Sequence, residues 1–423
     1  MANHITIHRK SPFPDQFQGR VRVSGAKNAA LPILTAAMMV QGPVVLNRVP
    51  HLKDVTTMVE LMGSFGVDFL MDESFNLEIN AEQANFASAS TELVQKMRAS
   101  FLLLGPMLAR FGRAELSLPG GCDFGDRPVD IHLSALKQLG VEFSMNNGQV
   151  IGALKHDRLV GAPVQMAGIS VTATENVIMA ACLAEGTTQI YGAAIEPEIV
   201  DLVDFLNTMG AKIGQVSADC IEIEGVERLH GGRYTVMGDR IEAGTFLIAS
   251  VMNQGHVTVE GIDPQWLTAV LAKLTDAGAQ IHCDDDTIEI KMHKQPKAVS
   301  IETAPYPGIP TDLQAQWIAL SAVSEGQSVV RETVFANRFS HIAELKAMGA
   351  QLRQDGDAVY CQGVPHLSGA DVVATDLRAS ASLVLAGCMA RGTTTIRKIH
   401  YIDRGYEYIE NKLMHLGVNI KRC

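Results

Sequence analysis

A single cysteine stands inside a loop rich in glycine and proline, over residues 118–128. Helices and central strands do not accommodate so many of these residues, so the segment is expected to be irregular. Cys122 lies in its middle, and Arg127 follows five residues later. A thiol on such a loop is more accessible than one in a core, and a nearby cation favours the thiolate. The loop is therefore either a surface turn with an incidental cysteine or the site of a reactive thiol.

Basic and polar residues recur where helices are expected to begin. Ser, Thr or Asp at a helix start usually caps the helix, and a lone arginine at a turn is usually solvated. Several helix starts aimed at one region would instead suit a phosphorylated ligand, because free N–H groups and partial positive charge gather there. The residues at such positions are Lys27, Asn28, Arg98, Arg127, Ser170, Thr172, Asp312, Arg338, Asp376 and Arg404.

An internal repeat provides that arrangement. Helix-like apolar segments end at glycines 66–74 residues apart, and an alternating, strand-like run follows each one. A second amphipathic segment then ends at another glycine, again followed by a strand-like run. In the first repeat Asp54 is the expected N-cap of this second helix. The two glycine series are Gly42, Gly112, Gly186, Gly255, Gly326 and Gly392, and Gly66, Gly140, Gly210, Gly278, Gly349 and Gly417.

Six repeats of this length predict an α/β protein with two similar domains of three repeats each, with a boundary near residues 230–237. The interval between the two marker glycines is 23–25 residues in five repeats and 28 in the second. The extra residues of the second repeat lie in the Cys122 loop. A repeat that departs from its siblings at one loop indicates a functional insertion there.

Composition limits the function classes. The chain has 423 residues, 47% hydrophobic and 19% charged, typical of a folded soluble protein, and its net charge of −11 argues against a nucleic-acid surface. The N-terminus lacks the apolar core of a signal peptide, and no apolar run reaches membrane-spanning length. Seven scattered cysteines without metal-ligand spacing fit a reducing cytoplasm. Cys182 and Cys388 lie in apolar helical runs and are expected to be packing thiols.

Nine segments together resemble the enolpyruvyl transferase family, and within it the members that act on UDP-N-acetylglucosamine. They extend from Ser24 to Tyr406, nearly the whole chain. The matching segments are 24–32, 97–100, 119–130, 196–201, 239–242, 310–312, 337–339, 375–380 and 402–406.

The resemblance implies an inside-out α/β barrel fold with two domains, 22–234 and 1–21 plus 235–423, which close over the substrate. It implies that phosphoenolpyruvate and UDP-N-acetylglucosamine give the 3-O-enolpyruvyl ether and phosphate, in the first committed step of peptidoglycan precursor synthesis. It implies no metal and no organic cofactor. Nothing in the sequence defines an oligomeric state.

The resemblance also implies roles for individual residues. Cys122 protonates the enol methylene and can capture phosphoenolpyruvate covalently, and Asp312 removes the proton of the sugar hydroxyl. The carboxylate and phosphate are held by Lys27, Arg98, Arg127, Arg338 and Arg404, of which Lys27 and Arg404 belong to the catalytic set. The UDP-sugar site is lined by Asn28, Pro128, Val129, Asp130, Ser170, Val171, Thr172 and Val334, and Asp376 supports the reacting centre.

Two differences from the family pattern lie beside the thiol, where Asp123 and Asp126 replace small or aliphatic residues. The sister enolpyruvyl transferase that acts on shikimate 3-phosphate shares the implied fold but lacks the loop cysteine, so Cys122 distinguishes the two. A non-catalytic nucleotide-sugar sensor would be expected to lose Asp312, Cys122 or the arginines. A purely structural repeat protein would not concentrate Lys and Arg at equivalent helix starts.

Overall fold

The computed structural model describes residues 4–9, 17–73, 76–85, 91–118, 129–217 and 219–423. Contacts divide the chain into two compact units, and we call Gly25–Met237 the first unit and Met1–Ser24 with Gly238–Cys423 the second unit. These boundaries fall three residues later than the expected 21/22 and 234/235. The reason is that β13 (Leu229–Thr235) pairs with β3 (Val40–Asn47) as far as Thr235, so the chain leaves the first unit only after that strand.

The first unit contains the first three repeats. In the first, α1 (Lys27–Ala37), β3 and α2 (Lys53–Gly63) precede the hairpin of β4 (Asp68–Met71) and β5 (Leu77–Asn80). The second contains α3 (Thr91–Lys96), η1 (Arg98–Leu103), α4 (Leu104–Phe111), β6 (Arg113–Ser117), α5 (Asp130–Lys137), β7 (Val141–Asn146) and β8 (Gln149–Leu154). The third contains β9 (Pro163–Gln165), α6 (Val171–Cys182), β10 (Thr187–Tyr191), α7 (Pro197–Thr208), β11 (Lys212–Ile213) and β12 (Ile221–Glu224).

The second unit contains the other three repeats. The fourth has β2 (Gln18–Arg22), α8 (Arg240–Met252), β14 (His256–Glu260), η2 (Pro264–Leu267), α9 (Thr268–Asp276), β15 (Gln280–Cys283) and β16 (Thr287–Lys291). The fifth has β17 (Ile301–Glu302), η3 (Thr311–Leu313), α10 (Gln314–Val323), β18 (Gln327–Arg331), α11 (Ile342–Ala347), β19 (Gln351–Asp355) and β20 (Ala358–Gln362). The sixth has β21 (Asp371–Val373), α12 (Leu377–Met389), β22 (Gly392–Arg397), η4 (Ile399–Arg404), α13 (Ile409–His415), β23 (Ile420–Arg422) and β1 (His4–Arg9).

Each repeat builds one sheet on a common plan. In the fourth, β14 is parallel to β2 and antiparallel to β16, which pairs with β15 to form a hairpin. The sheets of the first, third, fifth and sixth repeats have the same four-stranded order, and among the described residues the second has three strands. The N-terminal strand β1 lies between β22 and β23, so the beginning of the chain completes the sixth sheet.

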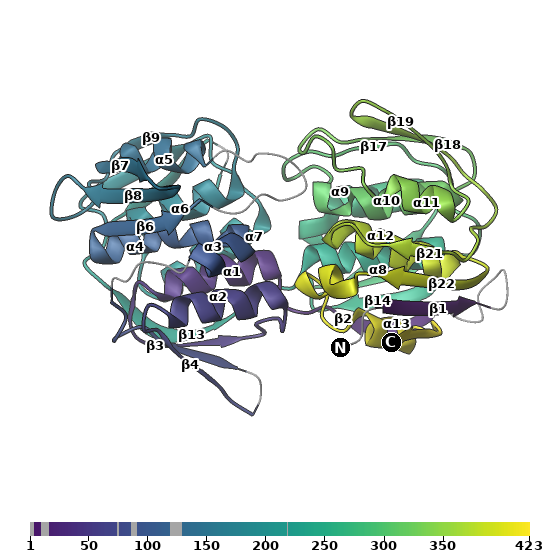
Figure 1. Ribbon diagram of the computed structural model, residues 1–423, viewed down its shortest axis with the longest axis horizontal. Helices are drawn as coiled ribbons and strands as arrows, with labels where there is room; N and C mark the ends of the chain where they lie inside the picture. The colour runs from purple at the N-terminus through teal and green to yellow at the C-terminus, as the bar shows by residue number, and fades with distance from the viewer. Residues whose placement is uncertain (1–3, 10–16, 74–75, 86–90, 119–128, 218) are drawn as a thin grey trace. The chain divides into compact units, whose positions relative to one another are not determined.

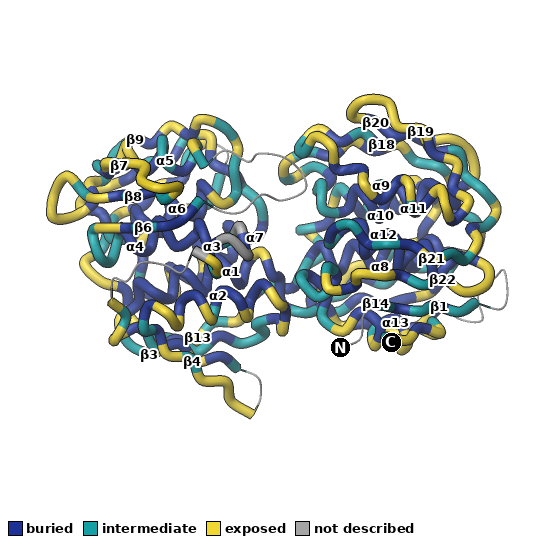
Figure 2. The backbone as a smooth tube through the Cα atoms, in the orientation of Figure 1, coloured by how far each residue is buried: buried dark blue, intermediate teal, exposed yellow. Residues whose placement is uncertain are grey.

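The first helix of each repeat lies inside its unit, and the sheets lie around it (Figure 1). All thirteen residues of α8 and all ten of α10 are buried, as are twelve of the thirteen in α12. These helices are mostly apolar and buried on every side, which is the pattern of a helix without a solvent face. Figure 2 shows the same helices as buried segments beneath an exposed outer layer. The arrangement is the inside-out α/β architecture that the resemblance to the enolpyruvyl transferases implies.

The second glycine series marks helix ends as predicted. All six glycines have φ between +83° and +107°, a conformation that ends helices because only glycine adopts it without strain. Gly42 differs from the prediction, since α1 ends at Ala37 and Gly42 lies within β3. Asp54 also differs. Helix α2 begins at Lys53, and Asp54 is in its first turn without capping it.

Candidate active site

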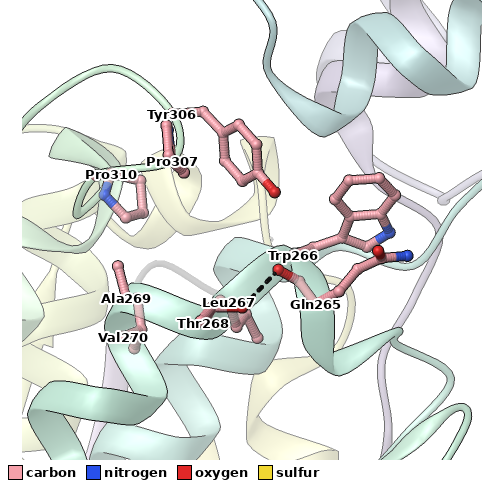
Figure 3. Close-up of a pocket in the computed structure, with 10 residues that line it drawn as sticks. Gln265, Trp266, Leu267, Thr268, Ala269, Val270, Tyr306, Pro307 and Pro310 are labelled. Atoms are coloured by element: carbon pink, nitrogen blue, oxygen red, sulfur yellow. Dashed lines mark hydrogen bonds between the residues drawn. The ribbon is translucent and has the colours of Figure 1, made fainter. Parts of the chain in front are cut away.

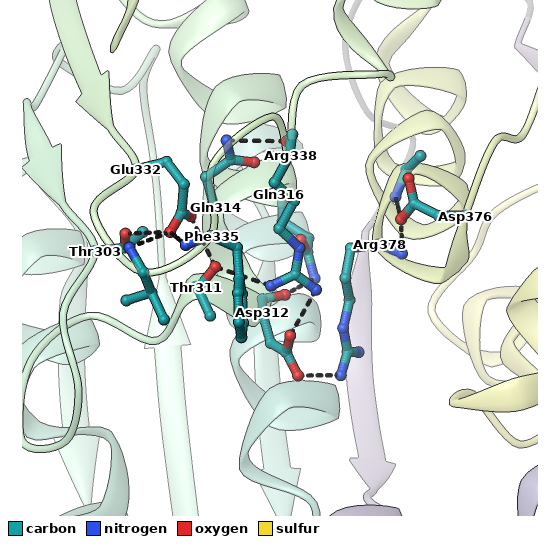
Figure 4. A network of polar contacts seen from close by, with 12 residues as sticks. Thr303, Thr311, Asp312, Gln314, Gln316, Glu332, Phe335, Arg338, Asp376 and Arg378 are labelled. Atoms are coloured by element: carbon teal, nitrogen blue, oxygen red, sulfur yellow. Dashed lines mark hydrogen bonds and ion pairs between the residues drawn. The ribbon is translucent and has the colours of Figure 1, made fainter. Parts of the chain in front are cut away.

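Asp312 and two arginines form an ion-paired group at the N-terminal ends of helices buried in the second unit. Arg378, on α12, places Nη2 2.5 Å from Asp312 Oδ2. Arg338, in the segment between β18 and α11, places Nη2 2.7 Å from Asp312 Oδ1. Each carboxylate oxygen therefore faces one guanidinium group, and the three side chains point toward one another (Figure 4).

This group is largely shielded from solvent. The side chains of Arg378 and Arg338 are 7% and 9% exposed, whereas that of Asp312 is 22% exposed. Burial opposes ionisation of Asp312, but the positive charges of Arg378 and Arg338 outweigh it and hold the pKa of Asp312 well below its usual range. Asp312 is therefore ionised at neutral pH and keeps an edge open to solvent.

The buried carboxylate of Glu332 shapes the segment that carries Arg338. Its Oε1 accepts hydrogen bonds from the backbone N–H groups of Val334 and Phe335, at 2.8 and 2.9 Å. Its Oε2 accepts from Thr311 Oγ1 at 2.7 Å, and Thr311 Oγ1 in turn accepts from Arg338 Nη1 at 2.8 Å. Glu332 thus links the turn containing Val334 to the arginine and to the residue just before Asp312.

Arg378 contacts Asp312 directly but has no role among the sequence predictions. It belongs to one of the matching segments, 375–380. Its Nη1 lies 3.4 Å from the hydroxyl of Tyr406, which is 1% exposed and bonds to Thr245 Oγ1 at 2.9 Å. The sequence did contain a signal for Arg378. At the start of α12 an arginine comes two residues after the capping Asp376, and at the start of α8 Arg240 directly follows the capping Asp239.

Asp376 caps α12. Its Oδ1 accepts from the backbone N–H groups of Arg378 and Ala379 at 2.8 and 3.0 Å, and its Oδ2 accepts from Ser340 Oγ at 3.0 Å. The carboxylate is buried. It contacts the backbone of Arg378 and serves as the cap of that helix. Arg404 ends η4 and is half-buried.

Lys27 is buried at the start of α1, in the first unit. Its Nζ lies 3.2 Å from Asp54 Oδ2, and the two side chains are 11% and 9% exposed. Asp54 therefore compensates a buried cation. It is the second residue of α2, inside the helix and beyond the N-cap position, which Leu52 occupies. Asn28, the next residue, is exposed.

A second group of predicted residues lies at the start of α6. Ser170 is the N-cap and accepts from the backbone N–H of Ala173 at 3.4 Å, and Val171 and Thr172 begin the helix. Thr172 Oγ1 lies 3.2 Å from Nε2 of His132, on α5. Helix α5 begins at Asp130, directly after Val129, so this contact joins the 129–130 and 170–172 segments.

Four predicted residues are not described in full. Cys122, Arg127 and Pro128 lie outside the described residues. Arg98 begins η1, and only its backbone is described.

A separate pocket of about 210 Å³ opens between η2, the start of α9 and the segment that leads to Asp312 (Figure 3). Trp266 and Tyr306 line it with ring centroids 6.2 Å apart, and Pro310 lies on its wall. None of the predicted site residues that the structure describes lines this pocket. Across the same described residues there is no helix long and apolar enough to cross a membrane, and no metal-binding group of three or more His, Cys, Asp or Glu.

Known sequences related to this chain cover nearly its whole length. The family described as EPSP synthase (3-phosphoshikimate 1-carboxyvinyltransferase) matches residues 13–413. A UDP-N-acetylglucosamine 1-carboxyvinyltransferase of Coxiella burnetii is 52% identical over 405 residues, covering 96% of this chain and 93% of that protein. The enzyme of that name from Hydrogenovibrio crunogenus is 51% identical over 411 residues, covering 97% and 98%.

Solved structures match the fold. The enolpyruvyl transferase NikO from Streptomyces tendae has a TM-score of 0.87 at 25% identity, with 99% of this chain and 98% of that chain covered. EPSP synthase from Acinetobacter baumannii has a TM-score of 0.78 at 18% identity, with 99% of both chains covered, a likeness in fold alone. The chain therefore belongs to the enolpyruvyl transferases, the family that the sequence motifs predict.

Proposed function

We infer that this protein transfers the enolpyruvyl group of phosphoenolpyruvate to the 3-hydroxyl of UDP-N-acetylglucosamine and releases phosphate. The observation that carries this conclusion is about 52% identity, over 96% of the chain, to proteins named for that activity. The sister activity toward shikimate 3-phosphate has weaker support, since the EPSP synthase structure is only 18% identical. The product places the protein at the entry to peptidoglycan precursor synthesis, and we propose a cytoplasmic location.

The chemistry requires one base and one acid. We propose that the Asp312 carboxylate takes the proton of the sugar 3-hydroxyl while the hydroxyl oxygen bonds to C2 of phosphoenolpyruvate. Cys122 gives a proton to the methylene carbon in the same step. The result is a tetrahedral adduct that carries a methyl group, the carboxylate and the phosphate on C2. In the second step the thiolate left on Cys122 takes back a methyl proton, the C2–O bond to phosphate breaks as the double bond re-forms, and the leaving phosphate takes the proton held by Asp312.

The ion pairs of Asp312 bear on this role. A carboxylate that two guanidinium groups hold below its usual pKa has little affinity for a proton. When an anionic substrate also binds Arg338 and Arg378, the two arginines lower the pKa of Asp312 less. The proton affinity of Asp312 therefore rises when the substrate is bound. Arginine suits this exchange because its planar fork binds carboxylates and phosphates with two hydrogen bonds.

We propose that phosphoenolpyruvate is held by Lys27, Arg98, Arg127, Arg338 and Arg404 together with Arg378, and that the reaction uses no metal or organic cofactor. The segments around Asn28, Val129 and Thr172 contact the UDP-sugar, with Val334 positioned by Glu332. Asp376 acts through Arg378, whose helix it caps.

The direct test of the reaction is product identification. Incubation of the protein with phosphoenolpyruvate and UDP-N-acetylglucosamine should give a new UDP-sugar heavier by the enolpyruvyl group, with vinyl protons in its NMR spectrum. A matched incubation without phosphoenolpyruvate is the control. Phosphate release without this ether would refute the proposed transfer.

Substrate binding should close the two units, because the proposed contacts come from both. Residues near Lys27 and Thr172 belong to the first unit, and Asp312 and Arg338 belong to the second. Closure would exclude water from the enol ether chemistry. Small-angle scattering should show a smaller radius of gyration with UDP-N-acetylglucosamine. An unchanged radius at saturating ligand, verified by calorimetry, would contradict closure.

A further inference from the structure

His132 is the centre of a buried hydrogen-bond network in the first unit. It lies in the first turn of α5, is 6% exposed, and packs edge-on against Phe101 of η1 with ring centroids 5.1 Å apart. Its two ring nitrogens face different partners. Nδ1 lies 2.9 Å from Nδ2 of Asn176, on α6, and Nε2 lies 3.2 Å from Thr172 Oγ1.

The backbone fixes the orientation of the Asn176 amide. Its Oδ1 accepts from the N–H of Gly105 at 2.6 Å, and its Nδ2 donates to the carbonyl of Phe101 at 2.9 Å. The opposite orientation would set an amide N–H against the Gly105 N–H and the amide oxygen against the Phe101 carbonyl. Because Asn176 is 0% exposed, neither conflict would be relieved by water. The amide nitrogen therefore faces His132 Nδ1 as a donor.

This orientation determines the tautomer of the histidine. Nδ1 faces an N–H donor and must accept, so a neutral ring carries its hydrogen on Nε2. The Nε2–H group then donates to Thr172 Oγ1. Since that oxygen accepts from His132, its own hydrogen is directed elsewhere. Thr172 is exposed, so its hydroxyl presents this hydrogen to solvent at the N-terminal end of α6.

We propose that His132 is a positioning residue for the UDP-sugar, because it orients the Thr172 hydroxyl as a hydrogen-bond donor toward the bound substrate. The inference rests on the proposed function, which puts the UDP-sugar against the 170–172 segment. A donor at this place supplements the free N–H groups at the start of α6, which favour a diphosphate. The same network ties η1, α5 and α6 together, so three segments that carry proposed ligand contacts share one anchor.

Two substitutions distinguish the hydrogen bonds made by the two ring nitrogens of His132. In His132→Asn the side-chain oxygen can still accept from Asn176, but the donor to Thr172 is lost. In His132→Gln the amide nitrogen reaches the position of Nε2 and can donate to Thr172, but the acceptor for Asn176 is lost. We expect His132→Asn to raise the Kd for UDP-N-acetylglucosamine about three- to tenfold, the effect of one hydrogen bond, and His132→Gln to restore binding.

Isothermal titration calorimetry with UDP-N-acetylglucosamine measures these affinities, and melting temperatures report folding. A merely structural role predicts losses that follow the melting temperature equally in both variants, and that result would overturn the proposal. Thr172→Val should raise Kd as His132→Asn does, and the double variant should bind no more weakly than either single one. Additive losses would show that His132 acts independently of Thr172.

Nitrogen-15 NMR of labelled histidine gives a readout that does not depend on ligand. The resonance that disappears in His132→Gln should show the hydrogen on Nε2, and a hydrogen on Nδ1 would refute the derivation. If the wild-type chain binds UDP-N-acetylglucosamine but forms no enolpyruvyl ether, the proposed function fails while the affinity comparison still decides the role of His132. Absence of any binding would overturn both.

Discussion

Asp312→Asn should lower kcat by about 10²–10⁴-fold, the usual effect of removing a general base. The amide keeps the shape of the carboxylate but cannot take the proton of the sugar hydroxyl. The substitution also leaves Arg338 and Arg378 without the anion that both now contact, and their side chains are only 9% and 7% exposed. We therefore expect the variant to fold but to melt at a lower temperature. Its free energy of unfolding should fall by up to about 3 kcal/mol.

Phosphate provides a sharp check on this explanation. An added anion can bind Arg338 and Arg378 in place of the lost carboxylate, so phosphate should raise the melting temperature of Asp312→Asn more than that of the wild-type chain. The matched control is Asp371→Asn, which removes an exposed ion pair with Arg397 in the same unit and should change neither kcat nor stability much. Near-normal turnover of Asp312→Asn would show that another group is the base.

Fosfomycin should alkylate Cys122 in preference to the other six cysteines. The thiolate would attack an epoxide carbon, forming a C–S bond and breaking a C–O bond, and the released oxygen takes a proton. Burial raises the pKa of Cys182, Cys361 and Cys388 to about 12, so these thiols stay protonated and shielded. The exposed Cys283 is the internal control for access, because it has no proposed anion site beside it.

The label is located by peptide mapping after brief treatment. Domain closure predicts that UDP-N-acetylglucosamine speeds the reaction, whereas Asp123 and Asp126 oppose it by disfavouring a nearby thiolate. Cys122→Ser should lose the label and most turnover, since a hydroxyl is a far weaker acid than a thiol. Cys122→Asp should resist the epoxide and retain some turnover. Labelling mainly at another cysteine, or normal turnover of Cys122→Ser, would contradict the proposed acid.

Features of the fold that follow local rules were predictable from the sequence. The six glycines from Gly66 to Gly417 adopt positive φ because each ends a helix that the pattern of apolar residues defines. The strand after each helix also alternates in its own sequence. Gly42 misled the prediction, because glycine in a β-rich run does not distinguish a helix end from a position inside β3. The unit boundary moved by three residues because pairing between β13 and β3, distant in sequence, decides it.

The candidate site was predictable in its residue types and not in its contacts. Motifs identified Asp312 and Arg338, but the contact with Arg378 joins residues 66 positions apart and depends on how α12 packs beside α10. The pairing of Lys27 with Asp54 was hidden in the same way, because an aspartate near a helix start equally predicts a cap. The orientation of His132 depends on the buried amide of Asn176, and no sequence pattern specifies it.

The choice of acceptor substrate decides between the two enolpyruvyl transfer reactions. Phosphate release from phosphoenolpyruvate should be measured with UDP-N-acetylglucosamine and, separately, with shikimate 3-phosphate, using Asp312→Asn as the blank for each. We expect rapid release with the UDP-sugar and none above the blank with shikimate 3-phosphate. Release with shikimate 3-phosphate, and none with UDP-N-acetylglucosamine, would refute the proposed transfer.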